Sequence, residues 1–448
     1  METEAVAEPP NHTFMKRLLN AILWCWLLAA AGGCATSQPA RFERADFSKP
    51  GFFPIMPWDP YHGWDQPLIE GRKNGLESIA QCNFNLAGFV LPKDLPLCRK
   101  LGLGAIMLPT DPTFTNIQYL FDWRKLSDAE IDRRVKSMVS AAGSSPAIMG
   151  YFITDEPAVQ DFPALAKAVA AVRKYAPGKL AYINLLADQY ARPSPSGAPQ
   201  LGTTNYTEYL ERFVTEVKPQ LLTYDNYAVQ HSGDLQQDPW MIASYCHNLL
   251  EIRRVAQQHH LPYLNIVASG QLGPGKYIPT PANLLFQAYT TLAAGYRGVT
   301  WYTYFGDGYL YAPLTKSGDK NLTWNYLQEV NRQVTTLAPL MSQLTSTGVF
   351  FSQPAPVDNL PLLPGNFVKS VECPTPIMVG EFKAQDGECY AMVVNLSLER
   401  SARFKLRTTG SAQIGVVSAA DGRLSPFDSN HSLWLPAGQG VLLMLGRL

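Results

Sequence analysis

Two adjacent acids, Asp155 and Glu156, end a short apolar run in the stretch GYFITDEPA, residues 150–158. Pro157 follows and keeps a strand from continuing, because proline cannot donate a hydrogen bond to a neighbouring strand. A general acid must hold a proton near neutral pH, so its pKa must be raised, and burial and a neighbouring carboxylate both raise it. We therefore predict that Glu156 is a general acid and base beside Asp155. The alternative is that Asp155 caps the following helix and Glu156 is an ordinary loop residue.

The elements that must position these acids follow a regular alternation of short apolar runs and helical patterns between residues 50 and 345. Strands are expected at 52–57, 84–90, 104–109, 148–154, 180–186, 220–227, 263–269 and 298–304. Helices are expected at 127–143, which opens with Ser127 and Glu130 as a capping box, and at 161–178, 206–219, 237–260, 280–298 and 323–345. The alternation implies right-handed crossovers and a parallel sheet, and eight strands in a region of roughly 300 residues fit a (β/α)8 TIM barrel. The competing open doubly wound sheet usually has a glycine-rich first turn, which is missing here.

Polar and aromatic residues gather where the expected strands end, which is where a barrel carries its active site. We expect catalytic groups at Asp155, Glu156 and Asp225, and substrate contacts at Trp58, Asp59, Asn184, Tyr224, Asn226, Tyr227, Trp301 and Tyr304. This set has almost no histidine and no evident metal cluster, which disfavours metal-assisted hydrolysis and predicts neither a metal nor a cofactor. Cleavage of a glycosidic bond needs two carboxyl groups and aromatic walls for sugar rings, so it is the predicted reaction, on an oligosaccharide or polysaccharide.

The passage YTTLAAGYRGVTWYTY, residues 289–304, resembles the helix and eighth strand of barrel glycoside hydrolases that include the family 42 β-galactosidase-like enzymes. In that clan the acid/base is a glutamate that ends strand four, which corresponds to Glu156. The clan's nucleophile is a glutamate that ends strand seven, whereas this chain reads NIVASGQ at 265–271, without an acid. The resemblance therefore leaves the partner carboxylate to be found elsewhere.

Asp225, at the end of the sixth expected strand, is the partner that we favour, either as nucleophile or as base for water. The α-galactosidase clan offers a similar pairing of strands four and six. The alternative outside enzymes is a barrel that only binds glycans for a surface uptake system.

A second enzymatic alternative uses the substrate's own acetamide as nucleophile. The adjacent Asp155 and Glu156 resemble the acids of family 20 and family 123 hexosaminidases, and LLTYDNY resembles the sixth strand of family 18 chitinases. The resemblance implies that Asp155 orients the acetamide, that Tyr224 and Asp225 hold it, and that Trp301 floors the sugar subsite.

Composition limits the class of protein. The chain has 448 residues, of which 46 % are apolar, so it can bury one large domain and a smaller one. Lys plus Arg and Asp plus Glu are 37 each, and no long basic run appears, which argues against a nucleic-acid partner.

The N-terminal segment predicts export. From Met15 the chain reads MKRLLNAILWCWLLAAAGGC, with two positive charges, an apolar run and small residues, which is typical of a signal peptide. The end of this run resembles the bacterial lipobox, in which the cysteine, here Cys34, is lipidated. We expect an N-terminal extension and lipoprotein signal peptide at 1–34, a tether at 35–50 and a lipid-anchored protein in the periplasm or at the cell surface. A plain signal peptide cleaved nearby is the alternative.

The pattern of apolar and polar residues changes after residue 346. Residues 347–448 alternate with period two and turn often, which predicts an antiparallel β-sandwich after a catalytic region at 51–346. Cys373 and Cys389 are placed to face each other across a hairpin, since export permits disulfides. Free buried thiols are the alternative.

Overall fold

The computed structural model describes residues 52–58, 75–108, 122–193, 197–230, 239–273, 276–306, 309–410, 414–427 and 433–447. The chain divides into two units, Met1–Glu43 and Arg44–Leu448, and the described residues belong to the second. The predictions for 1–34, 35–50, Cys34 and Asp59 lie outside the described residues. Within the described part, no helix is both long and apolar enough to span a membrane.

All eight expected strands are present. They are β1 (Ile55–Pro57), β2 (Leu86–Val90), β3 (Gly104–Met107), β4 (Ile148–Asp155), β5 (Leu180–Asn184), β6 (Leu222–Asp225), β7 (Tyr263–Ala268) and β8 (Val299–Tyr302). They form two parallel sheets in the orders β1-β8-β7-β6 and β2-β3-β4-β5. Parallel bridges connect the sheets at both edges, between Trp58 and Gly88 and between Leu185 and Tyr224. The predicted α/β class with parallel sheets is confirmed.

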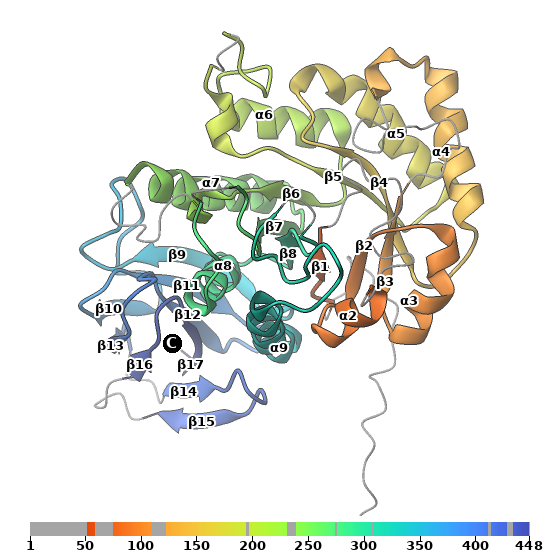
Figure 1. Cartoon of the computed structure of the whole chain (residues 1–448). Coiled ribbons are helices and arrows are strands. Elements are labelled where there is room, and N and C mark those ends of the chain that lie inside the picture. Colours follow the sequence, from red (N-terminus) through yellow and green to blue (C-terminus); the bar gives the residue numbers. More distant parts are fainter. Residues whose placement is uncertain are drawn as a thin grey trace, which may run out of the picture. The chain divides into compact units, whose positions relative to one another are not determined.

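Helices follow the strands and cover their outer faces (Figure 1). They are α2 (Leu76–Gln81), α3 (Leu95–Leu101), α4 (Asp128–Ala142), α5 (Phe162–Tyr175), α6 (Tyr206–Arg212), α7 (Pro239–Gln258), α8 (Pro281–Ala293) and α9 (Leu322–Met341). Short helical turns lie at Pro92–Asp94, Trp123–Lys125, Val159–Asp161, Asp188–Ala191, Phe213–Val217 and Ala228–Gln230.

Local sequence explains where these helices begin. The Ser127 side chain accepts a hydrogen bond from the Glu130 N–H at 3.3 Å, so the predicted cap of α4 is confirmed. Asn205 caps α6 and Thr280 caps α8 in the same way. These caps fix the starts of the helices that run back between successive strands.

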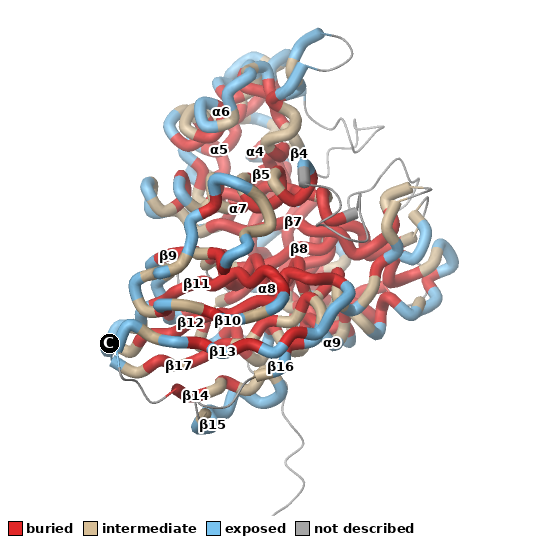
Figure 2. Tube along the Cα trace, turned by 90° about the vertical axis from the view of Figure 1, so that its left-hand side faces the viewer, coloured by how far each residue is buried: buried red, intermediate tan, exposed pale blue. Residues whose placement is uncertain are grey.

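Side chains on one face of each parallel sheet pack together in a shared apolar cluster, and we call this face the inner face. Its cluster holds apolar side chains from all eight strands or the residues next to them, including Met56, Ile106, Phe152, Tyr182 and Ile266. Because successive side chains along a strand point to opposite faces, residues two apart share the inner face. The tube in Figure 2 shows the strands buried along most of their length.

The C-terminal strands are antiparallel. They are β9 (Thr345–Phe351), β10 (Val368–Glu372), β11 (Ile377–Lys383), β12 (Cys389–Asn395), β13 (Ala402–Thr408), β14 (Ile414–Val417), β15 (Leu424–Phe427), β16 (Leu433–Leu435) and β17 (Gly440–Gly446). Their sheets have the orders β15-β14-β17-β12-β11-β9 and β10-β13-β16, and side chains of both sheets share one apolar cluster. The five described cysteines, Cys82, Cys98, Cys246, Cys373 and Cys389, are free, so the Cys373–Cys389 pairing is not formed.

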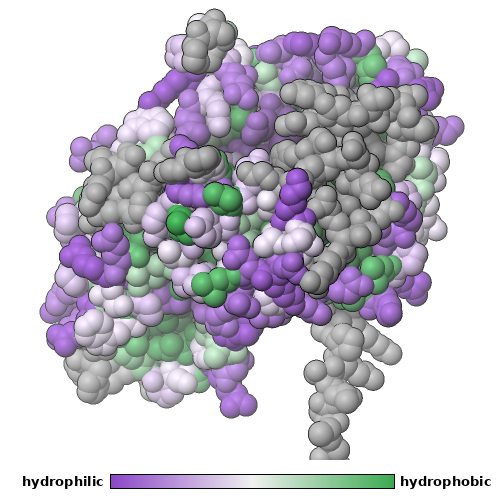
Figure 3. All heavy atoms as spheres, viewed as in Figure 1, coloured by the Kyte–Doolittle hydropathy of each residue, from purple (hydrophilic) through white to green (hydrophobic). Residues whose placement is uncertain are grey.

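Helix α8 packs between the parallel sheets and the C-terminal antiparallel strands. A side chain at Gly380 of β11 would come within 1.8 Å of the Ala293 carbonyl oxygen, and one at Gly440 of β17 would meet the Tyr289 ring. Glycine at these two positions therefore allows the six-stranded sheet to lie directly on α8. Hydrophilic residues predominate on the face shown in Figure 3, and exposed apolar side chains of the described residues include Trp240, Leu310 and Trp434.

Candidate active site

The turn after β4 places the two adjacent acids. Asp155 is the last residue of β4, and Glu156 follows with a φ of 48°. This left-handed conformation costs a residue other than glycine about 1 kcal/mol or more, and such costs concentrate at functional sites. The Glu156 N–H donates to the Asn184 carbonyl oxygen at 2.9 Å, which ties the turn to the end of β5. The turn therefore takes Glu156 out of the regular alternation of the strand.

The Glu156 side chain lies within hydrogen-bonding reach of the side chain of Asp225, the last residue of β6, and this contact affects the pKa of both groups. Asp225 lies on the inner face two residues after Thr223, whose Oγ1 is 3.4 Å from the Tyr182 hydroxyl. Two carboxyl groups bond to each other only when one of them holds a proton, because ionised carboxylates accept but do not donate. The structure thus brings the two predicted carboxyl groups together.

Burial and mutual repulsion raise the pKa values of these acids. Burial raises the pKa of Asp225 well above its ordinary value, and the charges of Glu156 and Asp155 raise it further. Burial also raises the pKa of Glu156, and the hydrogen bond from Asp225 partly offsets that rise. For Asp155, burial among neighbouring atoms and then the charge of Glu156 raise the pKa to about 8. Asp155 still has an exposed surface, so water moderates this rise.

Asn184 holds both acids of the turn. Its side-chain nitrogen donates to Asp155 Oδ1 at 3.0 Å, while its backbone carbonyl accepts from Glu156. The residue is only 1 % exposed, and its Oδ1 has no hydrogen-bond partner in the described part of the chain. A buried acceptor without a donor costs about 1–3 kcal/mol, so this oxygen is suited to a donor that a ligand brings.

Tyrosines surround Asp225. The Tyr227 side chain is close enough to Asp225 to lower its pKa, and the Tyr227 ring packs against Tyr302 with a centroid distance of 5.4 Å. The hydroxyls of Tyr302 and Tyr309 lie 2.6 Å apart. Burial raises the pKa of Tyr190, as do the charges of Asp225 and Glu156, which places Tyr190 near the pair.

Sequence reasoning missed Tyr190 and Tyr309 as members of this group. Both lie in connections after strands, Tyr190 after β5 and Tyr309 after β8. That position was the only signal that could have found them.

Three aromatic residues predicted to contact substrate point away from the inner face. The Tyr224 hydroxyl lies 3.3 Å from the Tyr296 hydroxyl, and Trp301 Nε1 donates to Asn331 Oδ1 of α9 at 2.9 Å. The Tyr304 hydroxyl accepts from Trp324 Nε1, also of α9, at 2.8 Å. All three are 0 % exposed. As placed, they pack the helices onto the sheet, so we no longer propose them as sugar contacts.

Two further predicted contacts are structural as well. Asn226 donates to Asn248 Oδ1 at 3.0 Å and accepts from the Ala228 N–H, so its amide is occupied. Trp58 is 2 % exposed, and its ring meets Phe89 edge to face at 4.8 Å. Neither side chain presents a free surface to a ligand. Of the predicted substrate contacts that the structure describes, Asn184 and Tyr227 lie beside the carboxyl groups.

The end of β7 carries no acid. Ser269 donates to the Thr303 carbonyl oxygen at 3.1 Å, and Gln271 Nε2 donates to the Lys276 carbonyl oxygen at 2.6 Å. Among the described residues, no group of histidine, cysteine, aspartate and glutamate could hold a metal ion.

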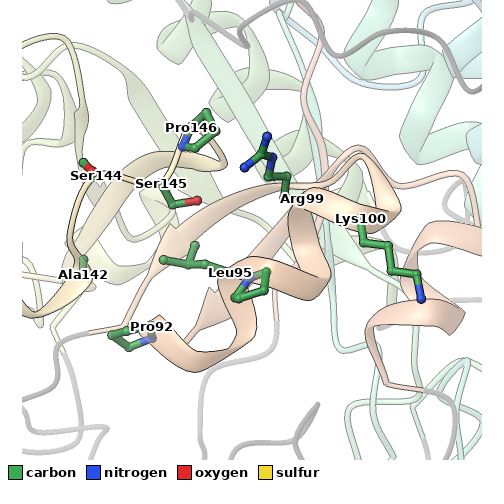
Figure 4. A pocket seen from close by; sticks show the side chains of 9 residues that line it. Pro92, Leu95, Arg99, Lys100, Ala142, Ser144, Ser145 and Pro146 are labelled. Atoms are coloured by element: carbon green, nitrogen blue, oxygen red, sulfur yellow. The ribbon is translucent and has the colours of Figure 1, made fainter.

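A pocket of about 760 Å³ lies elsewhere, between α3 and the α4–β4 connection (Figure 4). Its lining includes Arg99, Lys100, Ser144 and Pro146. Since Pro146 precedes β4, this pocket is at the opposite end of that strand from Asp155 and Glu156. It is therefore separate from the carboxyl groups.

Comparison with known proteins shows the fold. No protein-family model and no curated protein matches the chain. The chain is similar to a catalytic mutant of a GH42 β-galactosidase from G. stearothermophilus, with a TM-score of 0.57, 9 % identity and coverage of 91 % of this chain and 100 % of that one. The chain is also similar to a glycoside hydrolase family 5 protein from Bacteroides vulgatus, with a TM-score of 0.54 and 12 % identity. That match covers 91 % of this chain and 94 % of that one.

A β-galactosidase from the psychrophilic Marinomonas ef1 is also similar, with a TM-score of 0.50 and 9 % identity. That match covers 66 % of this chain, and this chain spans 63 % of the length of the Marinomonas protein. At such low identity the likeness shows that the chain has the fold of these glycoside hydrolases.

Proposed function

We propose that the chain is a glycoside hydrolase in which Glu156 is the general acid and base and Asp225 is its partner carboxyl group. The observation that carries the proposal is the close approach of these two side chains at the carboxyl ends of β4 and β6. The fold shared with glycoside hydrolases supports it. We further propose that the two bridged sheets close into a (β/α)8 barrel and that the C-terminal sheets form a sandwich.

The shared proton defines what the pair can do. When a glycoside oxygen displaces Asp225 from Glu156, Glu156 keeps the shared proton and Asp225 is left ionised. Glu156 then gives the proton to the glycoside oxygen as the bond between that oxygen and the anomeric carbon breaks, and the Asp225 carboxylate stabilises positive charge on the sugar ring. Water then supplies hydroxide to the anomeric carbon and returns its proton to the pair.

Substrate must part the two acids before this can happen. Carboxyl groups of retaining glycosidases are about 5–5.5 Å apart and those of inverting enzymes about 6.5–9.5 Å, whereas a direct hydrogen bond holds them closer. Glu156 is the more accessible of the two, since Asp225 is only 5 % exposed. We propose that the Glu156 side chain turns to admit the sugar, and that its new distance from Asp225 sets the stereochemical outcome.

The acetamide-assisted route has less support. It requires Tyr224 and Asp225 on one side of a pocket, but the Tyr224 hydroxyl faces Tyr296 on the outer side of β6. Adjacent strand residues alternate between faces, so Tyr224 cannot share a ligand with Asp225 while β6 stays regular.

Export and anchoring are a separate proposal that rests on the sequence alone. We propose that residues 1–34 direct export and that Cys34 carries the lipid. Metabolic labelling with a tagged fatty acid tests this, since a Cys34→Ala variant should lose the label.

A hydrolysis screen tests the proposed function. Protein that begins after Cys34 would be assayed on aryl glycosides and natural oligosaccharides, N-acetylhexosaminides included, with Glu156→Gln in parallel. Activity that the variant lacks supports the proposal. Glycan binding by both proteins without hydrolysis would favour a binding protein instead.

A further inference from the structure

The acids of the site are not balanced by positive charge in the described part of the chain. The charged groups that act on Asp225 are Glu156 and Asp155, and the one that acts on Asp155 is Glu156. Arg192 is engaged elsewhere, because it lies over the Trp240 ring at 4.7 Å and acts on Asp188. The described residues of this site therefore offer a ligand three carboxyl groups without a compensating cation.

Asp155 is the acid of the site to which the proposed reaction assigns no role. Glu156 and Asp225 bond to each other, whereas Asp155 is oriented by the Asn184 amide and keeps an exposed surface. Asn184 adds a second acceptor at the same place, since its Oδ1 is buried and has no partner in the described residues. Asp155 and Asn184 together thus offer acceptor oxygens to a group that only donates.

We propose that the site takes an amino sugar with a free ammonium group and that Asp155 binds this ammonium. The inference rests on the proposed function, because it concerns the same site. An ammonium carries three donors, no acceptor and a positive charge, so it suits both the acceptors and the charge. A neutral sugar leaves the charge uncompensated, an acidic sugar adds repulsion, and an N-acetylated sugar brings an acceptor and no charge.

Binding of monosaccharides tests the inference without any need for turnover. Glucosamine, glucose and N-acetylglucosamine, and the corresponding galactose set, would be titrated against the full chain by calorimetry. One close charge pair at a partly exposed site is worth about tenfold in affinity, so the amino sugar of at least one set should bind about tenfold tighter than its neutral parent. This advantage should shrink as salt is raised, because salt screens exposed charges.

Variants show whether Asp155 causes the preference. Asp155→Asn keeps the size of the side chain and removes its charge, so the ratio between amino and neutral sugar should fall toward one. Asp128→Asn, an exposed change on α4, is the matched control and should keep the wild-type ratio. Thermal unfolding of each variant shows that it is folded.

Equal binding of the three sugars, tighter binding of the N-acetylated or neutral sugar, or an amino-sugar preference that survives in Asp155→Asn would each overturn the inference. A preference without hydrolysis of any glycoside would leave the inference standing and contradict the proposed function. Hydrolysis of neutral glycosides without the preference would do the reverse.

Discussion

The carboxyl ends of β4, β5 and β6 differ sharply from those of β7 and β8. At the first set, Asn184 contacts Asp155 and Asp225 contacts Glu156, while Asn184 Oδ1 has no partner among the described residues. At the second, Trp301 and Tyr304 donate to or accept from residues of α9. Both sets looked alike as residue types. The comparison shows what decides whether a side chain at a strand end is free for chemistry. A side chain that bonds to a covering helix is not free, whereas one that contacts another strand end can be.

Replacing Glu156 should cause the largest loss of activity of the substitutions in the first set. Glu156→Gln keeps the shape but cannot exchange a proton, so kcat/KM on the best substrate should fall about 10²–10⁴-fold. Steady-state kinetics measures this. The matched change Glu399→Gln, at an exposed position in the C-terminal region, should stay near the wild-type value. Undiminished activity in Glu156→Gln would remove Glu156 as the acid.

Replacing Asp225 should cost activity and add stability. Asp225→Asn should lower kcat by about 10²-fold, because the pair loses a titratable member. The folded pKa of Asp225 is raised, so its protonated form stabilises the fold at low pH and this contribution is lost as pH rises.

The stability gain of Asp225→Asn over wild type should therefore grow with pH. The window opens at about pH 4, where an unfolded aspartate titrates, and extends up to the raised pKa of folded Asp225. Thermal unfolding at pH 5 and pH 8 measures it. A gain that shrinks toward pH 8 would show that Asp225 is not held protonated by its surroundings.

Replacing Asn184 should have an intermediate effect. Asn184→Ala removes the amide that orients Asp155 but keeps the backbone carbonyl that holds Glu156. The loss of one hydrogen bond to a charged group is worth about 1.4 kcal/mol, or tenfold in kcat/KM. Asn184→Asp, which cannot donate to Asp155 when ionised, should not restore activity. Kinetics that are unchanged in both variants would make Asn184 a packing residue.

Replacing Trp301 should leave activity nearly intact, in contrast with the first set. Trp301→Phe removes the hydrogen bond to Asn331 and some buried volume, so the free energy of unfolding should fall by about 1–3 kcal/mol. KM should change by less than about twofold, because the side chain faces α9 and not a ligand. Denaturant unfolding and kinetics measure the two effects. A large rise in KM would place Trp301 in a subsite after all.

The sequence predicted the elements well because their signals are local. Apolar runs identified all eight parallel strands, and Ser127 with Glu130 identified the start of α4. Tyr224 and Asp225 were both predicted at the site, although adjacent residues of a strand point to opposite faces. Packing against Tyr296, which is far away in sequence, decides that Tyr224 faces outward.

The site was predictable in its residue types and less so in its geometry. Adjacent acids at Asp155 and Glu156 were visible, but the left-handed turn at Glu156 and the role of Asn184 depend on the neighbouring strand. The register also shifts between Phe152 and Thr154 in β4, which breaks the alternation from which orientation would be read. Such irregularities come from tertiary contacts, and a single sequence carries no local signal for them.

The pairing of Glu156 with Asp225 is tested most directly by combining the two substitutions. Rates of hydrolysis would be compared for wild type, Glu156→Gln, Asp225→Asn and the double variant on the same substrate. Residues that act as a unit are strongly non-additive, so we predict that the double variant loses about as much activity as Glu156→Gln alone. Losses that multiply, or an Asp225→Asn variant as active as wild type, would contradict the pair and send the search for the partner carboxyl group elsewhere.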